Sequence, residues 1–215
     1  MGDVLGRPDP APVTYARGVE RELLVTGIGG QGIQLAASVM ARAALAEGRE
    51  VQLFGSYGGM MRGGATEATL VVADGPVEAP PTVGSAWSAI VMHHDFSRPT
   101  FARLAPGSVV FVNSTVFEGS FDRGPYVVVD VPATDLAVGL GNIMTASMVM
   151  LGAYSAVTAL AGLDSLVEAV AGALPPYRAQ HARLNQDALR AGYEAAPAVR
   201  VHAWVPEGAG EMVVA

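Results

Sequence analysis

Residues 23–32 read LLVTGIGGQG, an apolar strand that runs directly into a turn rich in glycine. Apolar side chains then recur at helical spacing over residues 31–47, and Gly48 provides a stop. A strand, a GxGxxG turn and a helix in this order place backbone N–H groups at the positive end of the helix, where a phosphate or a carboxylate can bind. The stretch predicts a Rossmann-like nucleotide fold but does not by itself identify a ligand.

A second glycine-rich segment, residues 55–64, follows the next predicted strand over residues 50–54, and its last nine residues read SYGGMMRGG. Arg62 offers a planar guanidinium that suits a carboxylate or a phosphate, and the flanking glycines let a ligand or another backbone come close. A structural ion pair inside a tight loop is the alternative for Arg62. Tyr57 forms either the wall of a ligand site or a core ring with its hydroxyl satisfied.

The rest of the chain predicts one α/β domain. Residues 65–72 form a strand that follows 50–54 too closely for a parallel crossover, so we expect it to be antiparallel. Further strands are expected at 88–93, 108–113 and 125–131, and helices at 96–104, 132–140, 142–163, 164–174 and 177–195. The predicted architecture is a single Rossmann-like domain with a mostly parallel twisted sheet, one antiparallel strand and helices on both faces.

Both ends of the chain differ from this central domain. Residues 1–20 are rich in proline, glycine and charge and are expected to form a flexible arm. The domain itself is expected over 21–196, and residues 197–215 form an extended tail. Residues 199–205 alternate in polarity and are expected to pair with a sheet edge or a partner.

The composition excludes several kinds of site. The chain has 215 residues and no cysteine, so it holds no iron–sulfur cluster by thiolates, no cysteine nucleophile and no disulfide. A net charge of −7 without a basic patch argues against nucleic acid. The four histidines show no metal-site spacing, and adjacent His93 and His94 would point to opposite sides of a strand. We therefore expect no metal site.

The surface is expected to be poor in charge. Only 15% of the residues are charged, against about a quarter in typical soluble domains. This indicates burial against another chain, or a high-GC genome, since all 13 basic residues are arginine. No uninterrupted apolar run reaches membrane-spanning length, and the N-terminus lacks the features of a signal peptide, so we expect a cytoplasmic protein that binds no membrane.

The sequence disfavours a dinucleotide. Such a unit usually carries an acidic residue at the end of its second strand, about 20 residues past the glycines. Here that strand ends with LFGS at residues 53–56, and Glu47 and Glu50 precede or begin it. A self-contained nucleotide-binding oxidoreductase therefore remains only an alternative.

Taken together, the two glycine segments resemble a known family, the gamma subunit or gamma domain of the 2-oxoacid:acceptor oxidoreductases. The family pattern is G-x-G-G-Q-G after a strand and, further on, S-Y-G-x-x-x-R-G-G, and this chain matches both at residues 27–32 and 56–64. Further matches are Gly141-Asn142 before a helix and the segment 185–194. Many members have Pro-Glu after the Tyr-Gly, where this chain has Gly59-Met60, so the loop does not identify the oxoacid.

The resemblance implies a subunit of a hetero-oligomeric enzyme that converts a 2-oxoacid and coenzyme A to acyl-CoA, carbon dioxide and two electrons. Thiamine diphosphate, magnesium and iron–sulfur clusters are then expected on partner subunits, an alpha/beta pair and an iron–sulfur subunit or ferredoxin. This chain would help to close the active site and would contact coenzyme A or substrate, or else serve as a pure scaffold. No activity is expected from the isolated chain, and no catalytic residue is assigned to it.

The candidate binding or interface residues lie in the two glycine segments and at two asparagines. Asn142 is explained equally well as a helix N-cap, and Asn113 ends a strand at the sheet edge where ligands collect. The full set is Gly29, Gly30, Gln31, Gly32, Ser56, Tyr57, Arg62, Gly63, Gly64, Asn113 and Asn142.

Overall fold

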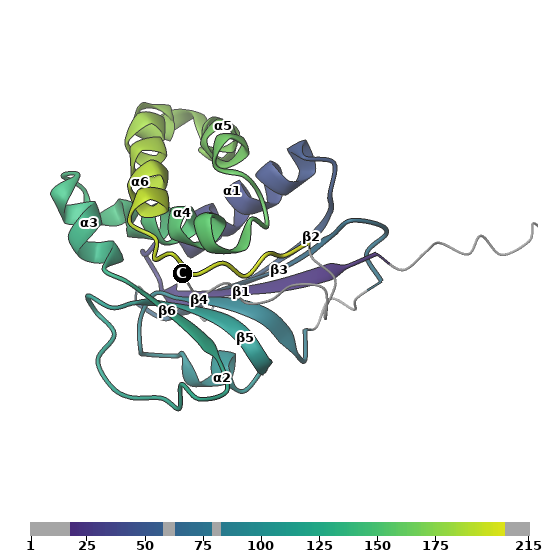
Figure 1. The fold of residues 1–215 in the computed structure, drawn as a ribbon. Helices are drawn as coiled ribbons and strands as arrows, with labels where there is room; N and C mark the ends of the chain where they lie inside the picture. The colour runs from purple at the N-terminus through teal and green to yellow at the C-terminus, as the bar shows by residue number, and fades with distance from the viewer. Residues whose placement is uncertain (1–17, 58–62, 79–82, 205–215) are drawn as a thin grey trace, which may run out of the picture.

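The apolar strand before the first glycine turn lies inside a six-stranded mixed sheet (Figure 1). This computed structural model describes residues 18–57, 63–78 and 83–204. The strand order is β2-β3-β1-β4-β5-β6. The strands are β1 (Glu20–Ile28), β2 (Glu50–Tyr57), β3 (Ala65–Ala73), β4 (Ala86–Val91), β5 (Leu104–Asn113) and β6 (Val127–Val131).

Strand β3 is antiparallel to both of its neighbours, β1 and β2, while β1, β4, β5 and β6 run parallel to one another. The expected antiparallel strand is therefore confirmed, and its place in the sheet is a new finding. Because β3 lies between β1 and β2, its first residue Ala65 stands opposite Ile28, the last residue of β1. The ends of the two glycine segments are thereby brought together.

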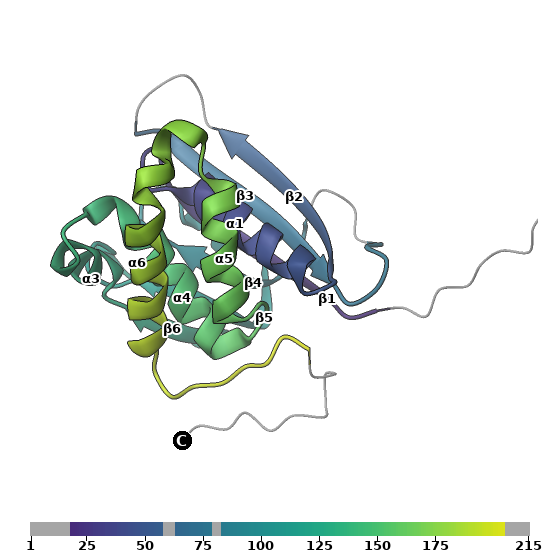
Figure 2. The same cartoon turned by 90° about the horizontal axis from the view of Figure 1, so that it is seen from above.

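Helices cover the two faces of the sheet unequally. They are α1 (Ile33–Ala46), α2 (Arg98–Phe101), α3 (Ala133–Gly139), α4 (Ala146–Thr158), α5 (Leu163–Ala173) and α6 (Ala182–Glu194), with 3-10 turns η1 (Ile143–Thr145) and η2 (Pro176–His181). Figures 1 and 2 show α1, α4, α5 and α6 over one face of the sheet, and the single turn of α2 on the other. That second face is closed by a smaller cluster in which Phe101, Phe117, Phe121 and Tyr126 take part.

Helix α4 lies at the centre of the helical layer, and every one of its residues is buried. Helix α6 packs on it through a narrow buried stripe at positions 185, 188, 189 and 192, the spacing of one helical face. At the crossing, a Cβ added to Gly192 would overlap the carbonyl of Val149, and one added to Gly152 would overlap the carbonyl of Leu189. The two helices therefore approach at backbone distance.

Several predicted boundaries move in the structure. Strand β2 continues to Tyr57, so Ser56 and Tyr57 belong to a strand and not to the expected loop. Helix α2 is only one turn of the expected helix 96–104, since β5 already begins at Leu104. At the amino end, Val19 already accepts a hydrogen bond from the N–H of Asp74 (3.2 Å).

The expected helix 142–163 is interrupted, and residues 199–204 of the tail do not pair with a sheet edge; pairing of the tail with a partner stays a prediction. Ala159 adopts a left-handed conformation that ends α4, and the Ser155 hydroxyl donates to the Ala161 carbonyl beyond it (2.6 Å). The tail packs on this end of α4, where the N–H groups of Val201 and Ala203 donate to the Val157 and Thr158 carbonyls (2.9 and 2.7 Å). Among the described residues, no helix is long and apolar enough to cross a bilayer.

Candidate functional site

The two glycine segments meet at a direct backbone contact. The N–H of Gly29 donates to the carbonyl of Gly64 at 2.8 Å. A Cβ added to Gly29 would lie 3.4 Å from the nitrogen of Gly63, in ordinary van der Waals contact, so the two segments lie directly against each other. The first glycine turn and the end of the second glycine segment therefore form one continuous surface.

Gln31 holds the first turn in shape. Its side-chain oxygen accepts a hydrogen bond from the N–H of Ile28 at 2.9 Å, and a Cβ on Gly27 would overlap that oxygen. The Gln31 amide is therefore turned toward the loop backbone, and its role is to fix the turn.

The turn leads into the positive end of α1. Gly32 is the N-cap, with a left-handed φ of 77°, and its carbonyl accepts the first helical hydrogen bond, from Ala36 (2.9 Å). The N–H groups of the first helical turn precede that bond and lack helical acceptors, as at every helix start. Gly30 next to them is exposed. The backbone therefore offers donors and a partial positive charge to an anion.

Gly32 also packs against α4. A Cβ at this position would lie 2.6 Å from the hydroxyl oxygen of Ser147. Ser147 is buried, and that oxygen has no hydrogen-bond partner among the described residues. The start of α1 and the start of α4 are thus in direct contact.

An open-sided pocket of about 660 Å³ lies over the start of α1. Residues from four parts of the chain line it: the glycine turn with the first turn of α1, the start of β3, the segment around η1, and the segment 174–185. The lining residues are Ile28, Gly29, Gly30, Gly32, Ile33, Gln34, Leu35, Thr66, Asn142, Met144, Thr145, Leu174, Arg178, His181 and Asn185.

The pocket suits an anion better than a cation. Its lining holds Arg178 and His181 and, among the described residues, no aspartate or glutamate. Magnesium prefers carboxylate oxygens, so this lining does not fit the metal that accompanies a bound diphosphate cofactor. Helix-end N–H groups and a guanidinium fit phosphate or carboxylate groups.

Sequence reasoning missed Arg178 and His181 as site residues. Both lie in or at the end of η2, after Pro175-Pro176, and no motif marks them. Asn185 lies in a segment that carried part of the family resemblance, and its amide donates to the His181 carbonyl at 2.8 Å. The packing of α6 on α4, which a sequence pattern does not reveal, brings these side chains to the glycine turn.

Of the other predicted residues, one lines the pocket and one only stabilises the fold. Asn142 lines the pocket and also caps η1, because its side-chain oxygen accepts from the Met144 N–H at 3.0 Å. Asn113 is fully buried, and its amide donates to the Thr134 hydroxyl at 2.9 Å, which joins β5 to α3. Asn113 therefore has a structural role and does not line the pocket. Arg62 lies outside the described residues.

Exposed apolar side chains border the pocket. Ile143, Met144 and Tyr177, which we call the rim patch, are 56%, 57% and 72% exposed. Met144 lines the pocket, and Tyr177 precedes the lining residue Arg178. Large exposed apolar side chains beside a pocket are candidates for contact with another molecule.

Comparison with known proteins gives a consistent result. The family model described as pyruvate ferredoxin/flavodoxin oxidoreductase matches residues 22–195. The pyruvate synthase subunit PorC of Methanothermobacter thermautotrophicus is 30% identical over 183 residues, which cover 84% of this chain and 98% of the relative. The 2-oxoglutarate synthase subunit KorC of Methanocaldococcus jannaschii is 29% identical over 183 residues, 83% of this chain and 95% of the relative.

The fold is also similar to a solved structure. The gamma subunit of a keto/oxoacid ferredoxin oxidoreductase from Geobacter sulfurreducens superposes with a TM-score of 0.69 at 28% identity. The match covers 82% of this chain and 95% of that one.

Proposed function

Because this chain belongs to the pyruvate ferredoxin/flavodoxin oxidoreductase family as a gamma-type subunit, we propose that its glycine-loop pocket binds the phosphate groups of coenzyme A in a thiamine-diphosphate-dependent enzyme. The chain is a subunit of a 2-oxoacid:ferredoxin oxidoreductase complex, and its relatives act in multi-subunit enzymes. The complex would oxidise and decarboxylate a 2-oxoacid and release acyl-CoA. Its partners would be a thiamine-binding alpha/beta pair and an iron–sulfur subunit or ferredoxin, in the cytoplasm.

The observation that carries this proposal is the pocket at the junction of the glycine segments. Donor groups at the start of α1 and the cation of Arg178 border one open space, which suits the negatively charged end of coenzyme A. When bound on a partner subunit, thiamine diphosphate supplies the carbanion chemistry. This chain's residues would bind and orient the anionic co-substrate and help exclude water.

The rim patch supports a partner subunit beside this pocket. Ile143, Met144 and Tyr177 would be buried against the thiamine-binding subunit, which would turn an open-sided pocket into an enclosed site. Closure by a partner also agrees with the low charge content of the chain. On this proposal, the isolated chain has no activity.

The dinucleotide alternative is disfavoured by the sheet order. In a dinucleotide-binding unit the second strand lies next to the first and places an acid near the ribose. Here β3 lies between β1 and β2, and the Gly29 N–H is already bonded to Gly64. Calorimetry with NAD and NADP tests this alternative, and we expect no sub-millimolar binding.

The test is steady-state kinetics of the complex purified from its native host, with Arg178→Gln compared with Arg183→Gln. Arg183 is an exposed arginine of α6 outside the pocket, so it is the matched control. Loss of one charge-assisted contact of about 1.5 kcal/mol should raise the KM for coenzyme A about tenfold, with kcat and assembly unchanged. An increase confined to the KM of the oxoacid would assign the pocket to that carboxylate, and lost assembly with normal turnover would indicate a scaffold.

A further inference from the structure

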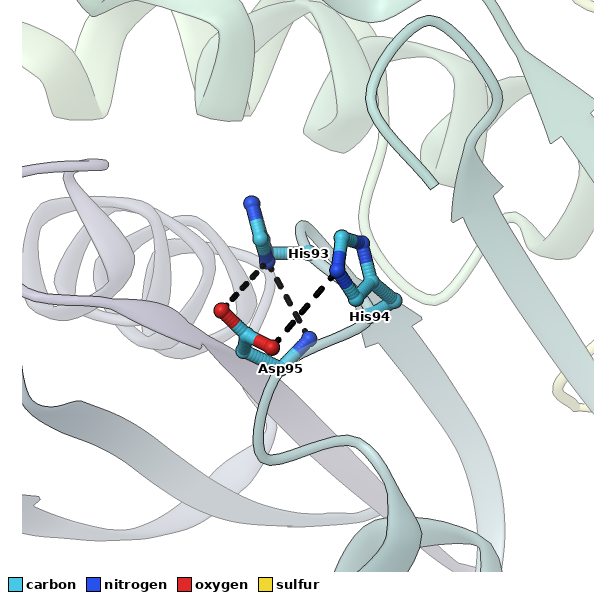
Figure 3. A group of neighbouring side chains, drawn as sticks. All are labelled: His93, His94 and Asp95. Carbon is cyan, nitrogen blue, oxygen red and sulfur yellow. Dashed lines mark hydrogen bonds and ion pairs between the residues drawn. The ribbon is translucent and has the colours of Figure 1, made fainter. Parts of the chain in front are cut away.

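Three side chains with metal-ligating atoms converge outside the glycine-loop pocket. His93, His94 and Asp95 each offer one ligating atom, and all three atoms lie within 4.8 Å of one another (Figure 3). Strand β4 ends at Val91, so the alternation that would separate adjacent histidines does not apply to them. Their rings stack instead, with centroids 4.3 Å apart.

We propose that His93, His94 and Asp95 bind one divalent first-row transition metal ion, with Zn²⁺ as the probe. Two imidazole nitrogens and one carboxylate oxygen are a ligand set that suits zinc, iron, nickel or copper better than magnesium or calcium. Three protein ligands leave at least one coordination position open for water or an exogenous anion.

The distances are close to those that a bound ion requires. His93 Nδ1 lies 3.7 Å from Asp95 Oδ2, and His94 Nε2 lies 3.5 Å from Asp95 Oδ1. With metal–ligand bonds of about 2.0–2.1 Å, two ligand atoms on a tetrahedral ion are about 3.3 Å apart. The two histidine–aspartate pairs, which involve different oxygens of Asp95, therefore need to close by only a few tenths of an ångström, and a small rotation of the side chains would bring all three ligand atoms, now within 4.8 Å of one another, onto one ion.

The Nδ1 atom of His93, which faces Asp95, is unprotonated and has a lone pair for a metal ion. His93 Nδ1 accepts a hydrogen bond from the Asp95 N–H at 3.1 Å, so it is unprotonated in this arrangement. A metal ion would take this lone pair in exchange for one backbone hydrogen bond, which contributes only about 1 kcal/mol to stability.

The second histidine, His94, has an acceptor beside its other ring nitrogen, as metal-bound histidines usually do. His94 Nδ1 lies 3.3 Å from the Val116 carbonyl. If Nδ1 carries the proton and donates it there, Nε2 is left free to bind a metal on the side of Asp95. The Glu118 N–H, 3.2 Å from the same Nδ1, favours the opposite tautomer, and a metal at Nε2 would select the first.

Backbone contacts hold the cluster from both sides. The N–H of Met92 donates to the carbonyl of Thr26 on β1 at 2.9 Å. The hydroxyl of Ser97 donates to the carbonyl of His94 at 2.7 Å. The ligands are therefore fixed at the carboxyl edge of the parallel strands, where α/β folds place their ligands.

The test uses the full chain without a histidine tag, treated with a chelator and then titrated with Zn²⁺ by calorimetry. We expect one equivalent to bind, and Co²⁺ in its place to give the visible absorption of a four- or five-coordinate ion. His94→Gln and Asp95→Asn should each weaken Zn²⁺ binding by at least about tenfold. His202→Gln, which changes an exposed histidine outside the cluster, is the control and should bind like the unchanged chain.

A thermal melt of each protein with and without Zn²⁺ provides a second readout. Binding to the native state raises Tm by mass action, so Zn²⁺ should raise the Tm of the unchanged chain and of the control more than that of the two cluster variants. Equal Tm values without metal show that the variants fold. Absence of Zn²⁺ binding, or cluster variants that bind Zn²⁺ as tightly as the unchanged chain, would overturn the proposal.

Discussion

The side chain of Gln31 forms a hydrogen bond within its own loop. Its oxygen accepts from the Ile28 N–H, and glutamate is the residue type that keeps a carbonyl-type oxygen at the same position along the side chain. Gln31→Ala should lower the free energy of unfolding by about 1 kcal/mol, because a partly buried N–H loses its acceptor. Urea unfolding measures the change.

Gln31→Glu is the matched variant for that experiment. It keeps the acceptor, so it should retain more stability than Gln31→Ala. It also adds a negative charge beside the anion site, so in the complex it should raise the KM for coenzyme A. If the two variants lost equal stability, the hydrogen bond to Ile28 would not be the reason.

The raised pKa of Glu22 should make the stability of the protein depend on pH. It accepts a hydrogen bond from the Trp87 N–H at 3.1 Å, and burial raises the pKa of its carboxyl above the ordinary value of 4.5. The native state therefore holds this proton more tightly than the unfolded chain. The tighter binding of this proton stabilises the native state fully below pH 4.5, and this stabilisation is lost as pH rises through the native pKa of Glu22.

Glu22→Gln imitates the protonated form of this carboxyl. At pH 7 the variant should be at least as stable as the unchanged chain, and the difference should close toward pH 4. Urea unfolding at both pH values measures it. A variant that is less stable at pH 7 would show that the charged form is the one the fold favours.

Individual site residues were predictable only where the role is local. Asn142 follows a glycine and precedes a helical pattern, so its capping role could be read from the sequence and is confirmed. Gln31 was expected among the binding or interface residues, and its hydrogen bond to Ile28 was not predicted, because side-chain direction in a loop has no sequence signal. Arg178 and His181 reach the pocket through tertiary packing and could not have been found from their neighbours in the chain.

At the scale of elements, the crossing of α4 and α6 depends on two glycines. A Cβ at Gly192 would overlap the Val149 carbonyl, and backbone cannot move aside as a flexible side chain can. Gly192→Ala should therefore destabilise the protein by about 2–3 kcal/mol, despite the higher helix propensity of alanine. Thermal and urea unfolding measure this.

Gly139 is the control for this substitution. It lies in α3, and nothing stands within 4 Å of a Cβ added there. Gly139→Ala should be neutral or stabilise by up to about 1 kcal/mol, the gain in helix propensity. If both substitutions had the same effect, close packing at the crossing would not be what Gly192 provides.

Periodicity identified most elements but not their order. The strand-turn-helix unit and the antiparallel β3 were predicted because hydrophobic spacing and loop length are local quantities. The position of β3 between β1 and β2 was not, because pairing partners are chosen by the whole sheet. The alternating tail segment does not pair with a sheet edge for a related reason: its N–H groups find acceptors at the end of α4.

For the whole molecule, the rim patch predicts a defined effect on assembly. Met144→Glu places a charge on a side chain that is 57% exposed, so the stability of the isolated chain should hardly change. A charge buried against a partner is costly, so the same variant should bind the thiamine-binding subunits at least about tenfold more weakly. Co-purification and analytical ultracentrifugation measure this.

Leu45→Glu is the matched control, because Leu45 is 55% exposed in α1 and does not line the pocket. It should assemble normally. If Met144→Glu also assembled normally, the rim patch would be an ordinary exposed surface.

The family could be predicted from two linked glycine motifs, but the surface that meets a partner could not, because exposure is a property of the folded chain.

The position of β3 also affects the order in which the chain can fold during synthesis. Among the described strands, β1 and β2 pair only with strands that follow them both. Once residues 20–57 have left the ribosome, two apolar segments and one helix are therefore exposed without a sheet hydrogen bond between strands to satisfy them. Until residue 73 has emerged, the nascent chain depends on transient collapse or on a chaperone to keep residues 20–57 from aggregating.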